Sequence, residues 1–280
     1  MDKTKIRWCE HTWNPFSGCS KVSPGCDHCY AETIATSPRF AGNFPNGFEP
    51  TYKPHKVGEP RRWRAPARVF TNSMSDFFHA DFSDEQRDAC FAVMLEVDRH
   101  HYLVLTKRPK AMHAYVMGWL ERQGLEEVPG HIWLGASVES DRYTWRADWL
   151  RKIPALVRFL SCEPLLTPLP SLDLSGIGWV IVGGESGKGY RPMPHEWAID
   201  LRDRCAEAEV AYFFKQSAAW RTEIGMDLEG ERIEEYPLAH PTTGGPLVLG
   251  RYVGRHGQEA AAEDDLLAEG LFAESPVRIG

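Results

Sequence analysis

Residues 102–109 read Tyr102-Leu103-Val104-Leu105-Thr106-Lys107-Arg108-Pro109. Four apolar residues in succession are typical of a strand that is buried on both faces of a sheet. A polar tail follows the strand, and behind it apolar residues recur with helical spacing at positions 112, 115, 116, 119 and 120. A strand, a polar tail and an amphipathic helix together form the unit from which parallel α/β folds are built.

The same unit recurs along most of the chain. Residues 5–13 supply a first strand, and apolar runs that end in polar residues begin near positions 68, 132, 157, 179 and 211. Ser83 and Gln86 form a capping box, which predicts a helix to about residue 98. After the run 157–160 the connection is short and rich in proline, so no full helix is expected there. With right-handed crossovers, these units predict an α/β fold: a partial or closed (βα) TIM-like barrel of about six to seven parallel strands.

The repeating pattern covers residues 1–217, which we expect to form the barrel. Residues 218–280 read as a small C-terminal extension that is partly irregular, with a short acidic amphipathic helix over 258–274. Within the barrel, residues 37–66 are rich in proline, glycine and asparagine and predict a long excursion. Excursions of this length are usually functional or flexible.

Composition narrows the class of protein. A hydrophobic content of 42% with 25% charged residues is ordinary for a globular chain, and a net charge of −7 argues against a surface that coats nucleic acid throughout. Seven cysteines, three of them clustered, indicate a reducing cytoplasm and a metal or cluster site. No apolar run approaches the roughly 20 residues that span a bilayer, and no signal peptide is visible. We therefore expect a cytoplasmic location without membrane contact; the sequence leaves the oligomeric state open.

Polar residues at the ends of the predicted strands are the first candidates for a functional site, because barrels of this kind place their sites at the carboxyl ends of the strands. These residues are Asn72, Ser73, Asp76, Lys107, Arg108, Ser137, Glu139, Glu163, Glu185, Lys215 and Gln216.

A cysteine loop follows the first predicted strand and belongs to the same rim. It reads Cys19-Ser20-Lys21-Val22-Ser23-Pro24-Gly25-Cys26-Asp27-His28-Cys29, a C-x6-C-x2-C spacing. Three thiolates on a short loop suit zinc or an iron–sulfur cluster, and three ligands leave one coordination position open for chemistry. Two alternatives remain: a closed zinc site with His11 or His28 as fourth ligand, and three unrelated cysteines.

The loop resembles the cluster loop of radical S-adenosylmethionine (radical SAM) enzymes. In that superfamily three cysteines hold three irons of a [4Fe–4S] cluster, and the fourth iron binds the amino and carboxylate groups of S-adenosylmethionine. The usual spacing there is C-x3-C-x2-C with an aromatic residue before the last cysteine, whereas here the first gap is six residues and His28 fills that position. Over roughly residues 5–217 the chain also resembles the phage gp37/gp68-like three-Cys-motif family, a domain of unknown function, through Trp13-Asn14-Pro15 and Cys29-Tyr30-Ala31.

The resemblance implies a radical-SAM-like barrel in which Cys19, Cys26 and Cys29 are both metal ligands and catalytic residues. With an external electron donor, such an enzyme cleaves S-adenosylmethionine to methionine and a 5′-deoxyadenosyl radical, which takes a hydrogen atom from a substrate. By position, the tail Asn72, Ser73 and Asp76 would bind the methionine amino group.

Further roles follow from the same comparison. Ser137 and Glu139 would hold ribose hydroxyls. Glu185 would bind an amine or ribose, although Gly183-Gly184-Glu185 also fits a plain tight turn.

Substrate contacts are predicted from charge. Lys107 and Arg108 suit a carboxylate or phosphate, with a rim salt bridge to Glu139 or Glu163 as the alternative, and Glu163 and Lys215 complete the substrate-binding set. The segment 61–68 combines four arginines with a tryptophan, which points to a nucleic acid or nucleotide; a solvated loop with a tryptophan anchor is the alternative.

A rival hypothesis makes the protein a non-catalytic module. The three cysteines and a histidine would then close a zinc site that staples the loop, and the barrel would bind nucleic acid or a partner protein.

Overall fold

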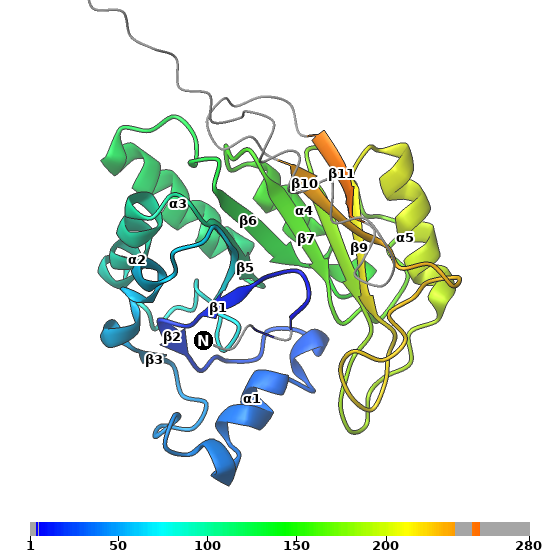
Figure 1. Ribbon diagram of the computed structural model, residues 1–280, viewed down its shortest axis with the longest axis horizontal. Coiled ribbons are helices and arrows are strands. Elements are labelled where there is room, and N and C mark those ends of the chain that lie inside the picture. Colours follow the sequence, from blue (N-terminus) through cyan, green and yellow to red (C-terminus); the bar gives the residue numbers. More distant parts are fainter. Residues whose placement is uncertain (1–3, 5, 239–247, 253–280) are drawn as a thin grey trace, which may run out of the picture.

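The computed structural model describes residues 4, 6–238 and 248–252. Its main feature is a curled nine-stranded sheet of order β1-β4-β5-β6-β7-β8-β9-β10-β11, in which all pairs from β1 to β9 are parallel and the last two strands are antiparallel (Figure 1). The strands are β1 (His11–Trp13), β4 (Arg68–Thr71), β5 (His101–Thr106), β6 (Ile132–Ser137), β7 (Arg158–Cys162), β8 (Trp179–Gly183), β9 (Ala211–Gln216), β10 (Glu234–Leu238) and β11 (Val248–Tyr252). The fold is thus a mixed α/β half-barrel, as predicted at this coarser level.

Four helices cover the convex side of the sheet: α2 (Asp84–Glu96), α3 (Pro109–Gln123), α4 (Trp145–Arg151) and α5 (His195–Glu207). Helix α1 (Tyr30–Ala35) instead follows the cysteine loop at the carboxyl edge of the strands, apart from the other four (Figure 1). Helix α4 packs on β6 and β7, α5 packs on β8 and β9, and α3 packs on α4. The predicted apolar stripe of α3 is buried, and the predicted capping box of α2 is present: Gln86 N donates to Ser83 Oγ, and Ser83 N donates to Gln86 Oε1.

The concave side of the sheet is filled by large side chains that alternate with the outward-facing ones. Trp133, Phe159, Trp179 and Phe213 belong to one buried cluster on this side. The amino-terminal segment adds Trp8, whose ring lies 4.5 Å from that of Phe70 and 6.3 Å from that of Trp179, centroid to centroid. The half-barrel therefore has an aromatic interior that the start of the chain completes.

The first strand is shorter than predicted. Only His11–Trp13 pair with β4, whereas residues 5–13 were expected to form the strand. Because Trp8 is inserted into the concave cluster, the backbone before residue 10 cannot continue along β4. Arg7 instead forms an ion pair with Glu234 of β10, and Tyr236 Oη donates to Arg7 O at 3.3 Å.

The excursion over 37–66 wraps the cysteine loop. Its strand β3 (Thr51–Tyr52) pairs with β2 (Phe16–Ser17) to form a small antiparallel sheet directly before the loop. The excursion also contains short 3-10 turns at Pro38–Phe40, Pro54–Lys56 and Glu59–Arg62. Two further 3-10 turns lie outside it, at Pro24–Cys26 in the cysteine loop and at Asp141–Tyr143. The excursion thus has few regular elements of its own, but it shapes the entrance to the sheet's carboxyl edge.

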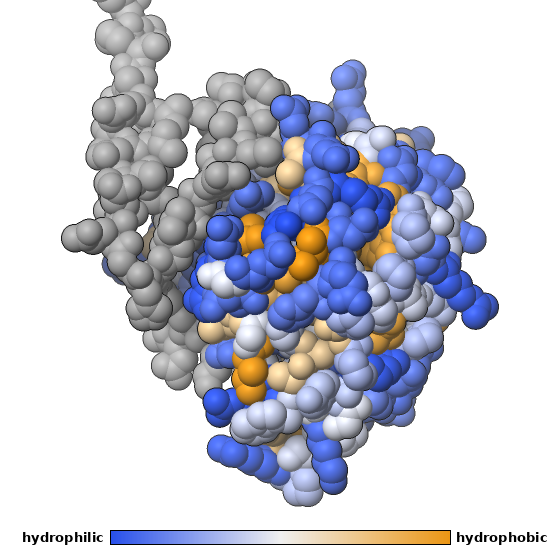
Figure 2. All heavy atoms as spheres, turned by 90° about the vertical axis from the view of Figure 1, so that its right-hand side faces the viewer, coloured by the Kyte–Doolittle hydropathy of each residue, from blue (hydrophilic) through white to orange (hydrophobic). Residues whose placement is uncertain are grey.

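Beyond residue 217 the described chain continues the sheet through β10 and β11. The predicted acidic helix over 258–274 lies outside the described residues. Polar residues cover most of the face that carries α5, and hydrophobic residues there form only small separate groups (Figure 2). No helix in the described part of the chain is long and apolar enough to cross a membrane.

Candidate functional site

A cavity of about 530 Å³ opens at the carboxyl ends of the parallel strands. This volume lies within the range of about 300–1,000 Å³ that small-molecule sites occupy. Its predicted wall residues, besides the three cysteines of the loop, are Asn72, Ser73, Asp76, Lys107, Arg108, Ser137, Glu163, Glu185, Lys215 and Gln216. Tails from six strands therefore converge on one space, as the strand pattern predicted.

Cys19, Cys26 and Cys29 all line this cavity and are partly exposed. The other four cysteines, Cys9, Cys90, Cys162 and Cys205, are buried, and burial raises the pKa of each of their thiols. Within residues 4, 6–238 and 248–252, no group of three or more His, Cys, Asp or Glu side chains is placed to hold a metal ion. The three thiols nevertheless form a soft donor set on one wall, which is the chemistry that zinc and iron–sulfur centres need.

The backbone of the cysteine loop is held by its neighbours. Gly18 has φ +81°, donates from its N–H to Met74 O at 3.0 Å, and presses so close to Glu49 that a Cβ would come within 2.2 Å of that carbonyl oxygen. Cys19 N donates to Phe48 O at 3.1 Å. The excursion thus fixes the first cysteine.

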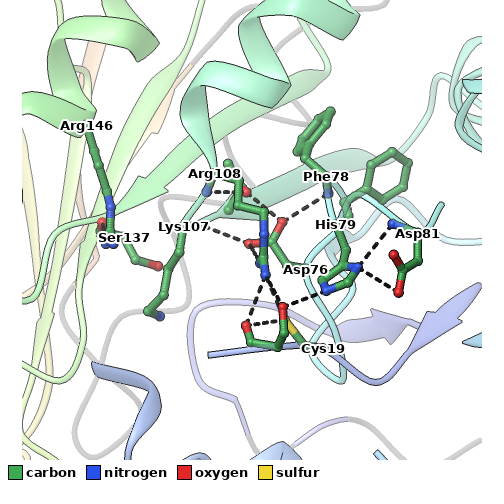
Figure 3. Close-up of polar contacts among 12 residues, drawn as sticks. Cys19, Asp76, Phe78, His79, Asp81, Lys107, Arg108, Ser137 and Arg146 are labelled. Carbon is green, nitrogen blue, oxygen red and sulfur yellow. Dashed lines mark hydrogen bonds and ion pairs between the residues drawn. The ribbon is translucent and has the colours of Figure 1, made fainter. Parts of the chain in front are cut away.

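Arg108 joins the loop to the end of β5 (Figure 3). Its guanidinium lies 3.0 Å from Asp76 Oδ2, 3.0 Å from Ser20 O and 3.4 Å from Cys19 Sγ. Asp76 also accepts hydrogen bonds from Thr106 Oγ1 at 2.6 Å and from Lys107 N at 2.9 Å. Burial and the nearby Asp76 charge raise the pKa of Cys19, while Arg108 offsets part of the effect.

These contacts revise two predictions. Asp76 was expected to bind a methionine amino group, but its oxygens are engaged with the β5 tail. Arg108 was expected to pair with Glu139 or Glu163 if it paired at all, but its carboxylate partner is Asp76. The β4 and β5 tails are adjacent in the sheet, which brings this pair together more directly than tails from β6 or β7.

Glu139 lies outside the cavity wall, contrary to its predicted ribose role. It is fully buried and accepts a hydrogen bond from Arg146 Nη1 at 2.7 Å. Gly25 of the cysteine loop sits on it, since a Cβ at Gly25 would lie 3.0 Å from Glu139 Cγ. Glu139 therefore packs against the cysteine loop at Gly25 and supports it.

Glu185 connects the β8 tail to the cysteine loop. It forms an ion pair with Arg191 and lies 2.8 Å from His28 Nδ1, while Arg191 Nη2 donates to Pro24 O at 2.9 Å. Burial alone would raise the pKa of Glu185, but hydrogen bonds from Arg191 and His28 outweigh it and lower the pKa. Glu185 is thus a bridging carboxylate as well as a wall residue.

Glu163 and Lys215 form an ion pair across the wall, with Lys215 Nζ 2.7 Å from Glu163 Oε1. Lys107 differs, because its ammonium has no ion-pair partner among the described residues, and its side chain points away from Arg108 in Figure 3. A charged amine that lines a cavity without a counter-ion suits an anionic ligand.

Asn72 is the most unusual wall residue. The residue is 3% exposed, its backbone has φ +65°, and neither Nδ2 nor Oδ1 of its side chain has a hydrogen-bond partner. Ser75 Oγ, also on the wall, is likewise unpartnered. A buried amide without partners costs about 1–3 kcal/mol, so its place on the wall points to a ligand that completes it.

A family model described as "Protein of unknown function (DUF5131)" matches residues 3–263. The chain belongs to this family. Searches of the curated proteins and of the solved structures gave no match. The family match also extends past residue 217, across the predicted start of the C-terminal extension.

Two site residues of this DUF5131 protein were missed at the level of sequence. Arg191 follows a glycine-rich loop without any motif, yet it ties Glu185 to Pro24. Tyr30 donates from Oη to Ser73 O at 2.5 Å and thereby links α1 to the β4 tail. A Tyr directly after a ligand-like cysteine was the one available signal for such a contact.

The arginine-rich segment over 61–68 lies apart from the main cavity. Trp63 is buried and stacks on His11 at 4.4 Å between centroids, and Arg61 forms an ion pair with Glu96. Trp63 and His11 help to line a second, smaller cavity of about 340 Å³. The segment therefore follows the predicted alternative of a loop with a tryptophan anchor.

Proposed function

We propose that this protein is a radical-SAM-type enzyme that carries a [4Fe–4S] cluster on Cys19, Cys26 and Cys29 and binds S-adenosylmethionine in the same cavity. The observation that carries the proposal is that all three cysteines line one ligand-sized cavity at the carboxyl edge of a parallel half-barrel. When bound and reduced by an external donor, the cluster would supply the electron that cleaves S-adenosylmethionine to methionine and a 5′-deoxyadenosyl radical.

The chain's own residues have supporting roles in this proposal. Arg108 holds Ser20 and Cys19 against the β5 tail, so the first ligand is positioned before a cluster binds. The unpartnered amide of Asn72 offers a donor and an acceptor to the polar groups of S-adenosylmethionine. Lys107 offers a cation to an anionic substrate in the same cavity.

Exclusion of water is the other task of the protein in such chemistry. The floor of the cavity is the aromatic interior of the half-barrel, with Trp8 and Phe70 on its wall. A carbon radical formed beside Trp8 and Phe70 would meet aromatic C–H bonds, which give up hydrogen less readily than the aliphatic C–H bonds of a substrate. The polar tails would then aim the substrate from the rim.

The decisive assay is anaerobic. Protein reconstituted with iron and sulfide, then given dithionite and S-adenosylmethionine, is expected to release 5′-deoxyadenosine. Cys26→Ala should abolish the release, whereas Cys205→Ala, in α5 and outside the cavity, should retain it. Release that persists in Cys26→Ala, or no release from an iron-loaded wild type, would contradict the proposal.

A zinc-stapled binding module is the second candidate, and one contact favours it. Glu185 lies 2.8 Å from His28 Nδ1, which leaves Nε2 of this cavity-lining ring for a metal. A carboxylate that orients a ligating histidine in this way is common around zinc. Under this hypothesis the barrel would bind nucleic acid or a partner protein without chemistry.

Metal analysis of the purified protein separates the two candidates. Iron with inorganic sulfide supports the enzyme, and zinc alone supports the module. If zinc is bound, His28→Ala should weaken it by about 10-fold or more, while Glu185→Gln should have a smaller effect in the same direction. If a cluster is bound, His28→Ala should leave the iron content unchanged.

A further inference from the structure

Trp220 is the most exposed large hydrophobic side chain in the described part of the chain, at 64%. It belongs to the loop that leaves β9, next to Arg221 and Thr222, both of which line the main cavity. The guanidinium carbon of Arg221 lies 4.7 Å from the centroid of the Trp220 ring. An open indole face with an arginine thus stands at the mouth of the cavity.

The loop that carries Trp220 is held in place on both sides. Ala219 N donates to Glu185 O, and Gly187 N donates to Ala219 O, both at 3.0 Å. Two residues after Trp220, Thr222 Oγ1 donates a hydrogen bond to Gln216 Oε1 at 2.8 Å. The backbone on both sides of Trp220 is therefore anchored, and a ligand would meet a ring carried on a positioned loop.

The neighbouring loop after β8, which pairs with this one at Ser186 and Ala219, adds further groups of the same kind. Tyr190 is 40% exposed, and Lys188 lies two residues before it. Among the residues that the structure describes, Lys188 and Arg221 form no ion pair, whereas Glu163 and Glu185 in the wall are paired with Lys215 and Arg191. The mouth therefore presents aromatic faces beside unpaired cations.

We propose that a single-stranded polynucleotide binds across this mouth, with one base stacked on Trp220 and phosphates held by Arg221 and Lys188. Aromatic faces interleaved with cations are how proteins bind single strands without reading sequence. The inference names the substrate class of the cavity, so its catalytic meaning rests on the proposed function, but the binding can be measured without any cluster.

A protein partner fits this surface less well. Within the two loops only Trp220 and Tyr190 are exposed large hydrophobic residues, which are too few for the buried core around which a protein interface forms. A base needs only one ring face and a phosphate needs only one or two cations, which is what this loop pair offers. The net charge of −7 argues against nucleic-acid contact over the whole surface and is compatible with a local patch such as this one.

The test is fluorescence anisotropy with short fluorescein-labelled oligothymidylate and oligouridylate and the full-length protein. Trp220→Ala should weaken binding by roughly five- to hundredfold, the range for loss of one stacked base. Trp220→Phe keeps an aromatic face and should stay close to wild type. Arg221→Ala should lower the slope of log affinity against log salt by about 0.7, the value for one phosphate contact with a single strand.

Trp145 supplies a matched control, because it is 38% exposed, has Lys110 at 5.3 Å from its ring and does not line the cavity. Trp145→Ala should bind like wild type. Equal losses in Trp145→Ala and Trp220→Ala would overturn the inference, as would undetectable binding by wild type. The inference would also be overturned if a mononucleotide displaced the labelled strand at the same concentration as an unlabelled oligonucleotide does. That result would indicate a site for a single nucleotide.

Failure here can be told apart from failure of the proposed function. Trp220-dependent binding with no 5′-deoxyadenosine release would retain this inference and remove the enzyme proposal. Release of 5′-deoxyadenosine with no binding of either strand would do the reverse.

Discussion

At the scale of the residue, Asn72 combines three features that folding alone does not favour. It is buried, its backbone has a positive φ, and its amide has no partner in the folded chain. Asparagine tolerates the left-handed region better than most residues, which explains how the chain accepts the conformation but does not explain the empty amide. Such a residue is expected where ligand binding is favoured over stability.

Asn72→Gly tests this interpretation. Glycine accepts φ +65° and removes an amide that lacks partners, so the free energy of unfolding should change by less than about 1 kcal/mol. Affinity for S-adenosylmethionine should fall by about 10-fold, because a hydrogen-bonded pair of contacts is lost. Urea unfolding and calorimetric titration measure the two effects. A large loss of stability with unchanged affinity would show that Asn72 is structural.

His101 gives a pH dependence on the concave face. Burial is the largest cause that lowers its pKa to about 4, from about 6.5 in an unfolded chain. The unfolded chain therefore binds a proton that the folded chain does not, and stability present above about pH 6.5 is lost as the pH falls toward 4, by up to about 3 kcal/mol.

His101→Phe should keep the ring contact with Trp133, which spans 4.9 Å between centroids, and remove the titration. We expect the variant to lose less stability than wild type between pH 7.5 and pH 5 in urea unfolding. Equal losses in both proteins would place the acid sensitivity at other groups.

At the scale of the element, the excursion over 37–66 acts as a brace for the cysteine loop. Its strand β3 pairs with β2, and its carbonyl oxygens at Phe48 and Glu49 lie against Cys19 and Gly18. A long segment without periodicity can therefore have a fixed position when a neighbouring loop supplies the hydrogen bonds that regular structure would otherwise make.

Gly18→Ala is the corresponding prediction. A Cβ would come 2.2 Å from Glu49 O and would also oppose φ +81°, so the loop and the excursion must separate. We expect iron bound after reconstitution to fall to less than about half, with a loss of about 1–3 kcal/mol in stability. Gly47→Ala, also at positive φ but with nothing within 4 Å of its Cβ, controls for the backbone effect alone.

Elements also mark where the sequence was informative. Each parallel strand after the first was predicted within a few residues because long apolar runs indicate burial on both faces, and the apolar stripe of α3 indicated its packed side. The first strand was predicted too long, because the hydropathy of Trp8 does not reveal whether it lies in a strand or in an aromatic cluster. The partner of Arg108 was missed because ion pairing depends on which tails are adjacent, which an apolar pattern does not encode.

At the scale of the whole molecule, the sequence predicted which residues gather at the candidate site. It did not predict which of them form ion pairs and hydrogen bonds with one another. Strand ends named ten wall residues, since parallel strands all finish on one edge. The sequence could not separate wall residues from supporting ones such as Glu139, whose burial depends on Arg146 and Gly25 around it. It also could not place Trp220 at the mouth, because exposure of a single tryptophan has no periodic signal.

The concave aromatic cluster is the predicted source of global stability. Trp8→Ala would leave a hole between Phe70 and Trp179 and should lower the free energy of unfolding by about 3–5 kcal/mol. Trp220→Ala, which removes an exposed ring, should lower it by less than about 0.5 kcal/mol. Urea unfolding of both variants checks the contrast. Similar losses would mean that the concave cluster is less important than its packing suggests.

The contact between Arg7 and Tyr236 joins residues that are 229 positions apart in the chain. During synthesis Arg7 and Trp8 are made long before β8 to β10, against which they rest. Domains tend to fold as units once their chain is complete. Arg7 and Trp8 can therefore complete their contacts only after β10 has been made, and until then the growing chain lacks part of the packing that shelters Trp8.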